Sequence, residues 1–105
     1  MKKISVVIPM YYEEEVAQEC YNRTSKVLQN LNRYEYEIIF VNDGSKDNTL
    51  DMLVDLANKD ENVKVVSFSR NFGHQAAVTC GLKHTTGDAV VIMDAEMQDP
   101  PEVIE

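Results

Sequence analysis

Short apolar stretches alternate with longer stretches of mixed polarity along the 105 residues of the chain. Four of the short stretches are rich in β-branched residues, and a proline or a polar residue follows each of them, which is typical of buried strands. They are Ile4–Ile8, Tyr36–Val41, Val63–Phe68 and Ala89–Met93. The pattern therefore predicts four strands.

The longer stretches predict three amphipathic helices, because apolar or small residues recur in them every three or four positions. The first helix is expected over Glu13–Leu31, with Glu13–Glu15 in a first turn where the helix dipole favours anions. The third is expected over His74–His84, and its internal Gly81 indicates close packing of that helix on the sheet.

The second helix is expected to be capped by Ser45 or Asp47 and to end near Lys59. Its buried face is expected to consist of Leu50, Leu53, Val54 and Ala57. The resulting order, βαβαβαβ, predicts a three-layer α/β domain, because each connection between strands is long enough for a right-handed helical crossover.

A mostly parallel sheet with the strand order 3-2-1-4 and helices on both faces follows from that order of elements. In such Rossmann-like sheets, ligands bind outside the carboxyl ends of the strands at the point where the strand order reverses. Here this point lies between the first and the fourth strand.

Every unusual polar cluster of the sequence follows one of the predicted strands. The clusters are Pro9–Glu13, Asn42–Ser45, Ser69–Gly73 and Asp94–Glu96. Because carboxyl ends of parallel strands share one edge of a sheet, these clusters are expected to converge on a single site. No G-x-G-x-x-G follows the first strand and no G-x-x-x-x-G-K-[ST] occurs, so neither a dinucleotide fingerprint nor a P-loop is supported.

Charge narrows the choice of ligand. Eighteen acidic against ten basic residues give a net charge of -8, which disfavours nucleic acid or an anionic membrane surface as a partner. An acidic protein that binds phosphate groups needs a cation. Cys20 and Cys80 match no zinc-binding spacing and are expected to be buried thiols in a reducing compartment.

Asp94 and Glu96 are candidate metal ligands, because side chains two positions apart in an extended segment point to the same side. Mg²⁺ and Mn²⁺ prefer oxygen ligands and are often held by one or two carboxylates together with substrate phosphates. Gln98 can add a carbonyl oxygen. Such an acidic pair is often only a solvated loop, but its place at the expected ligand edge predicts a metal site.

The other clusters contain residues with both a functional and a structural interpretation. Asp43 can accept an N–H group of uracil or guanine, but Asn42–Ser45 also suits a turn required by backbone geometry alone. Arg70 suits a phosphate or base contact, or else a surface ion pair. Tyr11 can stack on a base or simply pack at the strand end. Phe72 is expected in the core.

Taken in order, these motifs resemble those of the family 2 glycosyltransferases. The matching segments are Ser5–Glu15, Val41–Ser45, Ser69–Gly73 and Gly87–Pro101. The likeness covers essentially the whole chain and is strongest to the branch of dolichyl-phosphate mannose synthase and bactoprenol-phosphate glucosyltransferase. It implies the nucleotide-binding half of a GT-A fold.

The resemblance also implies roles for individual residues. The nucleotide pocket would be lined by Pro9, Tyr11, Glu13 and Asp43, with Arg70 close to it, and the metal positions would be Asp94, Glu96 and Gln98. The implied reaction transfers a hexose, with inversion, from a UDP- or GDP-linked sugar to a polyprenyl phosphate in cell-envelope or glycoconjugate synthesis. Mg²⁺ or Mn²⁺ would stabilise the departing diphosphate.

Two residues depart from the family pattern. Tyr12 stands where the family usually has Asn, and Glu96 stands where it usually has a second Asp. Glu96 keeps the charge but adds a methylene, so it either still coordinates the metal or withdraws from it. The alternative function is therefore a catalytically disabled nucleotide-binding module of the same fold.

Relative to the family, residues 1–105 are expected to form a single N-terminal nucleotide-sugar-binding domain without the acceptor-binding half. We expect this chain to be inactive alone and cytoplasmic, in a parent protein held at the cytoplasmic face of the membrane by segments beyond residue 105. The fourth strand is expected at an edge of the sheet, where its apolar side chains favour self-association.

Overall fold

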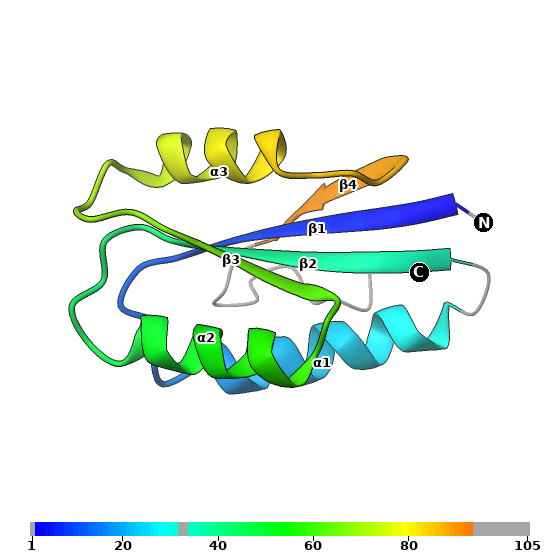
Figure 1. Cartoon of the computed structure of the whole chain (residues 1–105), viewed down its shortest axis with the longest axis horizontal. Coiled ribbons are helices and arrows are strands. Elements are labelled where there is room, and N and C mark those ends of the chain that lie inside the picture. The colour runs from blue at the N-terminus through cyan, green and yellow to red at the C-terminus, as the bar shows by residue number, and fades with distance from the viewer. Residues whose placement is uncertain (1, 32–33, 94–105) are drawn as a thin grey trace.

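A parallel sheet lies between two layers of helices in the computed structural model, which describes residues 2–31 and 34–93 (Figure 1). The elements are β1 (Lys2–Met10), α1 (Ala17–Asn30), β2 (Tyr34–Asn42), α2 (Thr49–Lys59), β3 (Val63–Ser67), α3 (His74–Lys83) and β4 (Ala89–Ile92). All strand pairs are parallel, in the order β3-β2-β1-β4. The predicted fold class and strand order are confirmed.

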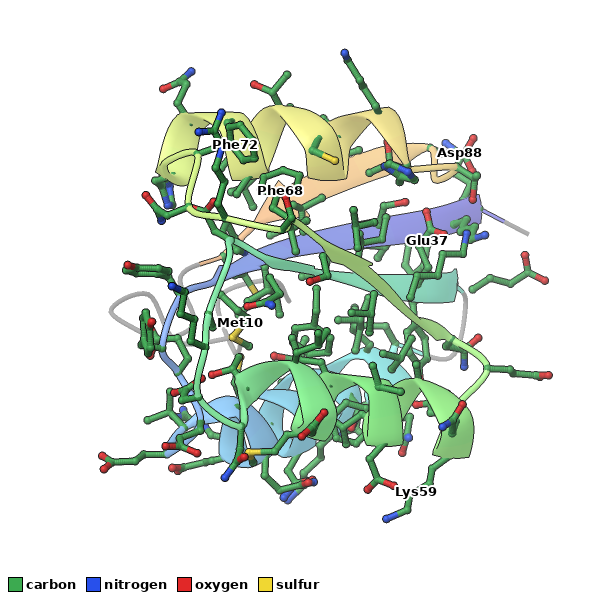
Figure 2. All side chains as sticks on the ribbon, turned by 60° about the vertical axis from the view of Figure 1, so that its left-hand side comes forward. Met10, Glu37, Lys59, Phe68, Phe72 and Asp88 are labelled. Atoms are coloured by element: carbon green, nitrogen blue, oxygen red, sulfur yellow. The ribbon has the colours of Figure 1, made fainter. Side chains whose placement is uncertain are left out.

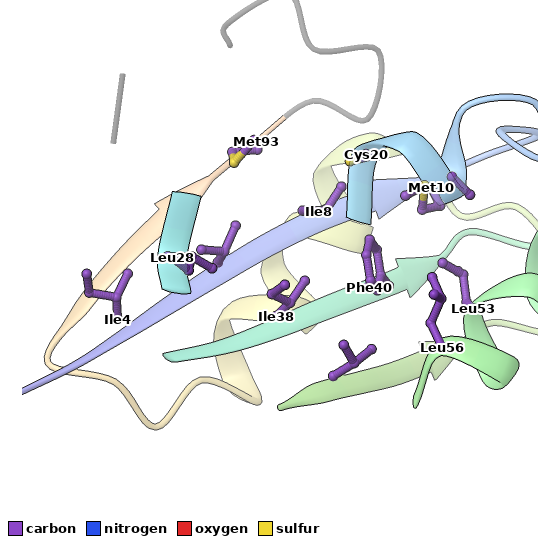
Figure 3. Packing of buried hydrophobic residues seen from close by; sticks show 13 residues of the cluster. Ile4, Ile8, Met10, Cys20, Leu28, Ile38, Phe40, Leu53, Leu56 and Met93 are labelled. Carbon is purple, nitrogen blue, oxygen red and sulfur yellow. The ribbon is translucent and has the colours of Figure 1, made fainter. Parts of the chain in front are cut away.

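The main core lies between the sheet and the layer formed by α1 and α2 (Figure 3). Alternate residues of a strand point to opposite faces, so the even-numbered residues of β1 and β2 share this face. Ile8, Met10 and Phe40 are fully buried here, and they pack with Cys20 of α1 and Leu53 of α2. This packing holds the carboxyl ends of β1 and β2 against the two helices.

On the other face, α3 lies directly on β1 and β2 (Figure 1). Ile39 and Val41 of β2 are buried there with Ala77 of α3. A Cβ atom added to Gly81 would lie 2.4 Å from Cγ1 of Val7, which no real contact allows. The close packing expected from Gly81 is confirmed, and it brings the helix backbone onto the sheet.

The helix boundaries correct several expectations. α1 begins at Ala17 rather than Glu13, because the carbonyl of Glu13 accepts the N–H groups of Val16 and Ala17 in a separate turn. The three glutamates therefore precede the helix instead of forming its first turn.

The start of α2 also differs from expectation. The cap position is Asn48, which makes no side-chain capping hydrogen bond, while Asp47 accepts the N–H group of Thr49 at 3.0 Å. Val54 was expected in the core but is 43% exposed, and Leu56 is buried in its place. Leu53 is buried and Ala57 packs against the core as expected, so the buried face of α2 is rotated relative to the predicted one but overlaps it.

The expectation of two buried thiols holds for Cys20 but not for Cys80, which is partly exposed, and both cysteines are reduced. Across residues 2–31 and 34–93, none of the helices has the length and apolar character needed to cross a membrane.

Candidate functional site

A pocket of about 270 Å³ opens at the carboxyl edge of the sheet, where β1 and β2 end beside the start of α3. Its lining residues come from three segments that are distant in sequence: the end of β1 with the residues after it, the turn after β2, and the start of α3 with the loop before it. They are Pro9, Met10, Tyr11, Glu13, Asp43, Asn71, Gly73 and His74. Four of the five residues predicted to bind the nucleotide therefore meet in one cavity. Arg70, the fifth, is not among the lining residues.

Asp43 connects the segments that line this pocket through hydrogen bonds of its side chain and backbone. The residue is only 3% exposed, and its carboxylate accepts hydrogen bonds from the N–H groups of Phe72 at 2.8 Å and Gly73 at 3.0 Å. The side-chain amide of Asn71 donates to the same carboxylate at 2.9 Å. The Asp43 N–H group in turn donates to the Met10 carbonyl at 2.8 Å. One residue thus joins the ends of β1 and β2 to the loop before α3.

Gly44 allows the turn after β2 to lie against the backbone of the loop before α3. A Cβ atom at this position would lie 2.2 Å from the Arg70 carbonyl carbon and 2.4 Å from the Asn71 nitrogen. The φ of Gly44 is 77°, a conformation that costs glycine little. The turn motif of Asn42–Ser45 is therefore explained by backbone geometry at Gly44 and by the hydrogen bonds of Asp43.

Two tyrosines follow the end of β1 at the mouth of the site. The rings of Tyr11 and Tyr12 meet edge to face with their centroids 4.6 Å apart. The backbone here is fastened to the connection between β2 and α2: Ser45 Oγ accepts the Tyr12 N–H at 2.8 Å, and Thr49 Oγ1 accepts the Glu13 N–H at 3.0 Å. Glu13 is thereby attached to the start of α2 as well as to the turn that precedes α1.

Arg70 lies on the loop that lines the pocket, but its side chain contacts Phe72 and does not line the pocket. Its guanidinium carbon is 4.7 Å from the ring centroid of Phe72, a cation–π contact. Phe72 also meets Phe68 edge to face, yet its side chain is 51% exposed. The expectation that Phe72 belongs to the core is wrong, because its ring lies on the outside of the loop beneath Arg70.

The predicted metal ligands Asp94, Glu96 and Gln98 lie outside the described residues. Met93, the last described residue, lies at the carboxyl end of β4, where its N–H donates to the Val7 carbonyl at 2.9 Å and extends the pairing of β4 with β1. Within the part of the chain that the structure describes, no three His, Cys, Asp or Glu side chains are grouped as metal ligands.

A second polar network, which the sequence did not reveal, lies at the opposite end of the sheet. Figure 2 shows Glu37 and Asp88 at this end, away from Met10 and Phe72. The buried carboxylate of Glu37 is 2.7 Å from Lys64 Nζ and accepts the N–H group of Thr86 at 2.7 Å. Ser5 Oγ donates to the same carboxylate.

Burial raises the pKa of the Glu37 carboxyl, but the hydrogen bonds from Lys64, Ser5 and the Thr86 N–H outweigh it and lower the pKa from 4.5 to about 2. The network fastens the connection between α3 and β4 to β1 and β2. A signal existed in the sequence: Ser5 and Glu37 are polar positions beside apolar runs, and they pair in register across β1 and β2.

The fold and the pocket define a class of protein: an open parallel α/β domain with a ligand-sized cavity at the carboxyl edge of its strands. The family model for glycosyl transferase family 2 matches residues 5–105. The chain belongs to this family, and the predicted resemblance is confirmed.

Two curated relatives of the chain are named as glycosyltransferases. The chain is 47% identical over 100 residues to the uncharacterized glycosyltransferase YkcC of Bacillus subtilis (strain 168). The aligned residues make up 95% of this chain and 31% of the relative. It is 49% identical over 102 residues to the bactoprenol glucosyl transferase of Shigella phage SfX. Here the aligned residues make up 97% of this chain and 33% of the relative. The chain thus spans about a third of the length of these curated relatives.

A solved structure with the same fold is that of S. aureus TarS 1–349 in complex with UDP-GlcNAc. The likeness covers 90% of this chain and 26% of the TarS chain, with a TM-score of 0.75 and 29% sequence identity. It supports a GT-A, Rossmann-like architecture for the four strands and three helices described above.

Proposed function

We propose that this chain binds the nucleoside-diphosphate sugar in a glycosyltransferase that moves a hexose, with inversion, from a UDP- or GDP-linked donor to a polyprenyl phosphate. The observation that carries the proposal is the pocket in which Pro9, Tyr11, Glu13 and Asp43 meet. Its volume of about 270 Å³ lies just below the range of about 300 to 1,000 Å³ for whole small-molecule sites. It therefore suits the nucleoside end of the donor.

The base is proposed to lie between Tyr11 and Asp43. The Tyr11 ring is half-exposed and lines the pocket, so one face of a flat base can stack on it. Oδ1 of Asp43 accepts one N–H group, from Phe72, and a carboxylate oxygen can accept two. Asp43 can therefore accept an N–H group of uracil or guanine without losing the bonds that hold the loop.

The diphosphate is proposed to extend from the pocket toward the Asp94–Gln98 segment. Met93 brings the chain to the same edge of the sheet, and carboxylate and amide oxygens suit Mg²⁺ or Mn²⁺. When bound, the metal would supply positive charge that stabilises the leaving diphosphate. Arg70, on the loop that lines the pocket, is proposed to contact the same phosphates.

The acceptor is proposed to be a polyprenyl phosphate, which the name of the bactoprenol glucosyl transferase relative supports. A phosphate is ionised near neutral pH, so it needs positioning more than it needs a general base. The residues that bind this acceptor are proposed to lie outside the present chain, at the cytoplasmic face of a membrane. Sugar transfer to a lipid phosphate by this chain alone would contradict that assignment.

Equilibrium titration with UDP and GDP, each with and without Mn²⁺, tests the proposal. We expect one of the two nucleotides to bind and to bind more tightly with Mn²⁺. Asp43→Asn should weaken this binding at least tenfold, whereas Asp55→Asn, an exposed site on α2, should leave it unchanged. If neither nucleotide binds, the proposal is wrong.

The second candidate is a nucleotide-binding module without catalysis, favoured specifically by Glu96 in the predicted metal motif. The same titration separates the two functions. Equal affinity with and without Mn²⁺ would favour the disabled module, and restoration of metal dependence by Glu96→Asp would identify Glu96 as its cause.

A further inference from the structure

Tyr12 adopts a backbone conformation that its side chain disfavours. Its φ is 53°, and among residues 2–31 and 34–93 it is the sole residue other than glycine with a positive φ. Bulky side chains are uncommon in this left-handed region, whereas Asn and Gly enter it readily. Such strain persists only where surrounding structure imposes it, and it often marks a functional position.

The surrounding structure imposes it through two hydroxyl groups. The N–H group of Tyr12 donates to Ser45 Oγ at 2.8 Å, and the next N–H group along the chain, that of Glu13, donates to Thr49 Oγ1 at 3.0 Å. Both hydroxyls belong to the segment that follows β2. The backbone is thus held in place on either side of the Tyr12 side chain.

Burial of the Tyr12 ring does not offset the strain, because the side chain is 47% exposed. Its ring instead meets the ring of Tyr11 edge to face, at 4.6 Å and an interplanar angle of 82°. Tyr11 lines the pocket, whereas Tyr12 does not. The Tyr12 ring therefore supports Tyr11 from outside the cavity.

We propose that Tyr12 is a positioning residue that holds the Tyr11 ring in place to stack on the base of a nucleoside diphosphate. This inference rests on the proposed function. An unsupported, half-exposed tyrosine loses side-chain freedom when a ligand binds, and that loss weakens binding. Tyr12 removes part of the loss in advance, since an edge-to-face contact restricts the Tyr11 ring before the ligand arrives.

Two substitutions at position 12 test the inference by affinity and stability together. Tyr12→Asn removes the ring, keeps the N–H donor to Ser45 and relieves the backbone strain. It should weaken binding of UDP or GDP about three- to tenfold, as expected for an aromatic pair contact. The relieved backbone strain and the lost ring contact act in opposite directions on stability, so the midpoint temperature of unfolding should change by less than about 4 °C. Tyr12→Phe keeps the ring and should bind within about twofold of the wild type.

Weaker binding by Tyr12→Asn without a loss of stability, together with unchanged binding by Tyr12→Phe, is the diagnostic result, because a general loss of structure would lower stability and affinity together. Tyr34→Asn is the matched control, because Tyr34 is a similarly exposed tyrosine at the start of β2, outside the pocket. It should leave nucleotide affinity unchanged. A Tyr12→Asn protein that binds as tightly as a nucleotide-binding wild type would overturn this inference alone. A wild type that binds neither UDP nor GDP would overturn the proposed function as well.

Discussion

The side-chain amide of Asn71 donates to Oδ2 of Asp43 at 2.9 Å and to the Asp43 carbonyl at 3.2 Å. One side chain thus satisfies two acceptors of the residue that fastens the pocket. Asn71 is itself exposed, so its contribution comes from this contact and not from burial in the core. The loop before α3 is thus held by polar contacts to Asp43 in addition to the packing of Phe68 against the core.

Asn71→Ala should therefore lower the free energy of unfolding by about 1 kcal/mol and weaken UDP or GDP binding several-fold. The N–H groups of Phe72 and Gly73 would still hold Asp43, so the fold should survive. Urea denaturation and nucleotide titration measure the two effects. Asn58→Ala, an exposed change on α2, should leave affinity unaltered, and an equal loss in both variants would contradict the assigned role.

Glu37 should give the protein an acid-sensitive part of its stability. Its folded-state pKa of about 2 lies below the ordinary 4.5, so the stabilisation is present above about pH 4.5 and is lost as pH falls toward 2. At about 1.4 kcal/mol per pKa unit it amounts to about 3 kcal/mol. Glu37→Gln should therefore be about 3 kcal/mol less stable than the wild type at pH 6, with a smaller deficit at pH 3.

Urea denaturation at both pH values checks this prediction. Glu35→Gln is the control, because Glu35 is exposed on the same strand and should show a small difference at either pH. A deficit of Glu37→Gln that is the same at pH 6 and pH 3 would show that the ionised carboxylate is not the source of the stability.

Gly81→Ala should destabilise the protein, although alanine is normally favoured over glycine inside a helix by about 1 kcal/mol. The added Cβ would meet Val7 Cγ1 at 2.4 Å, and such overpacking costs about 1 to 3 kcal/mol. In a Val7→Ala background the closest obstacle is gone and Cγ2 of Val41, at 3.2 Å, is the nearest remaining atom, so the same change at Gly81 should cost less. Thermal denaturation of the four proteins in this double-mutant cycle measures the difference, and additive effects would argue against the contact with Val7.

β4 should mediate self-association of this chain. Val90 and Ile92 are 41% and 48% exposed on a strand that lies at the edge of the described sheet. Light scattering at high protein concentration should show species larger than the monomer, and Ile92→Lys should reduce them. Val54→Lys introduces the same charge at an exposed apolar site on α2 and should not. A monomeric wild type would contradict the prediction.

The topology could be predicted because it depends on the order of elements alone. Four apolar runs separated by helix-length connections leave few arrangements, and the right-handed crossover selects among them. The side-chain details were less predictable. Periodicity alone did not distinguish Val54 from Leu56 as the buried residue of α2, because the two lie on opposite sides of the buried Leu53 and the pattern does not fix which side faces the sheet.

The convergence of the polar clusters could also be predicted, since parallel strands end at the same edge. The partners of Asp43 could not, because they depend on how closely Gly44 allows the loop at Arg70 to approach. Similarly, nothing local distinguishes an acidic residue that begins a helix from one such as Glu13, whose backbone is held by Thr49 from another segment. Contacts between distant segments decided both cases.

The central position of β1 has a consequence for synthesis on the ribosome. β2 can pair with β1 soon after both emerge, but the other side of β1 must wait for β4. Lys3 and Asp88, which are joined by a hydrogen bond on that side, are 85 residues apart in the sequence. Pairing across such a separation is slow, because loop closure precedes any gain from contacts. Until then, β1, whose residues Ile4–Ile8 are buried in the folded protein, presents an open side, and chaperones that shield it should improve the yield of folded protein.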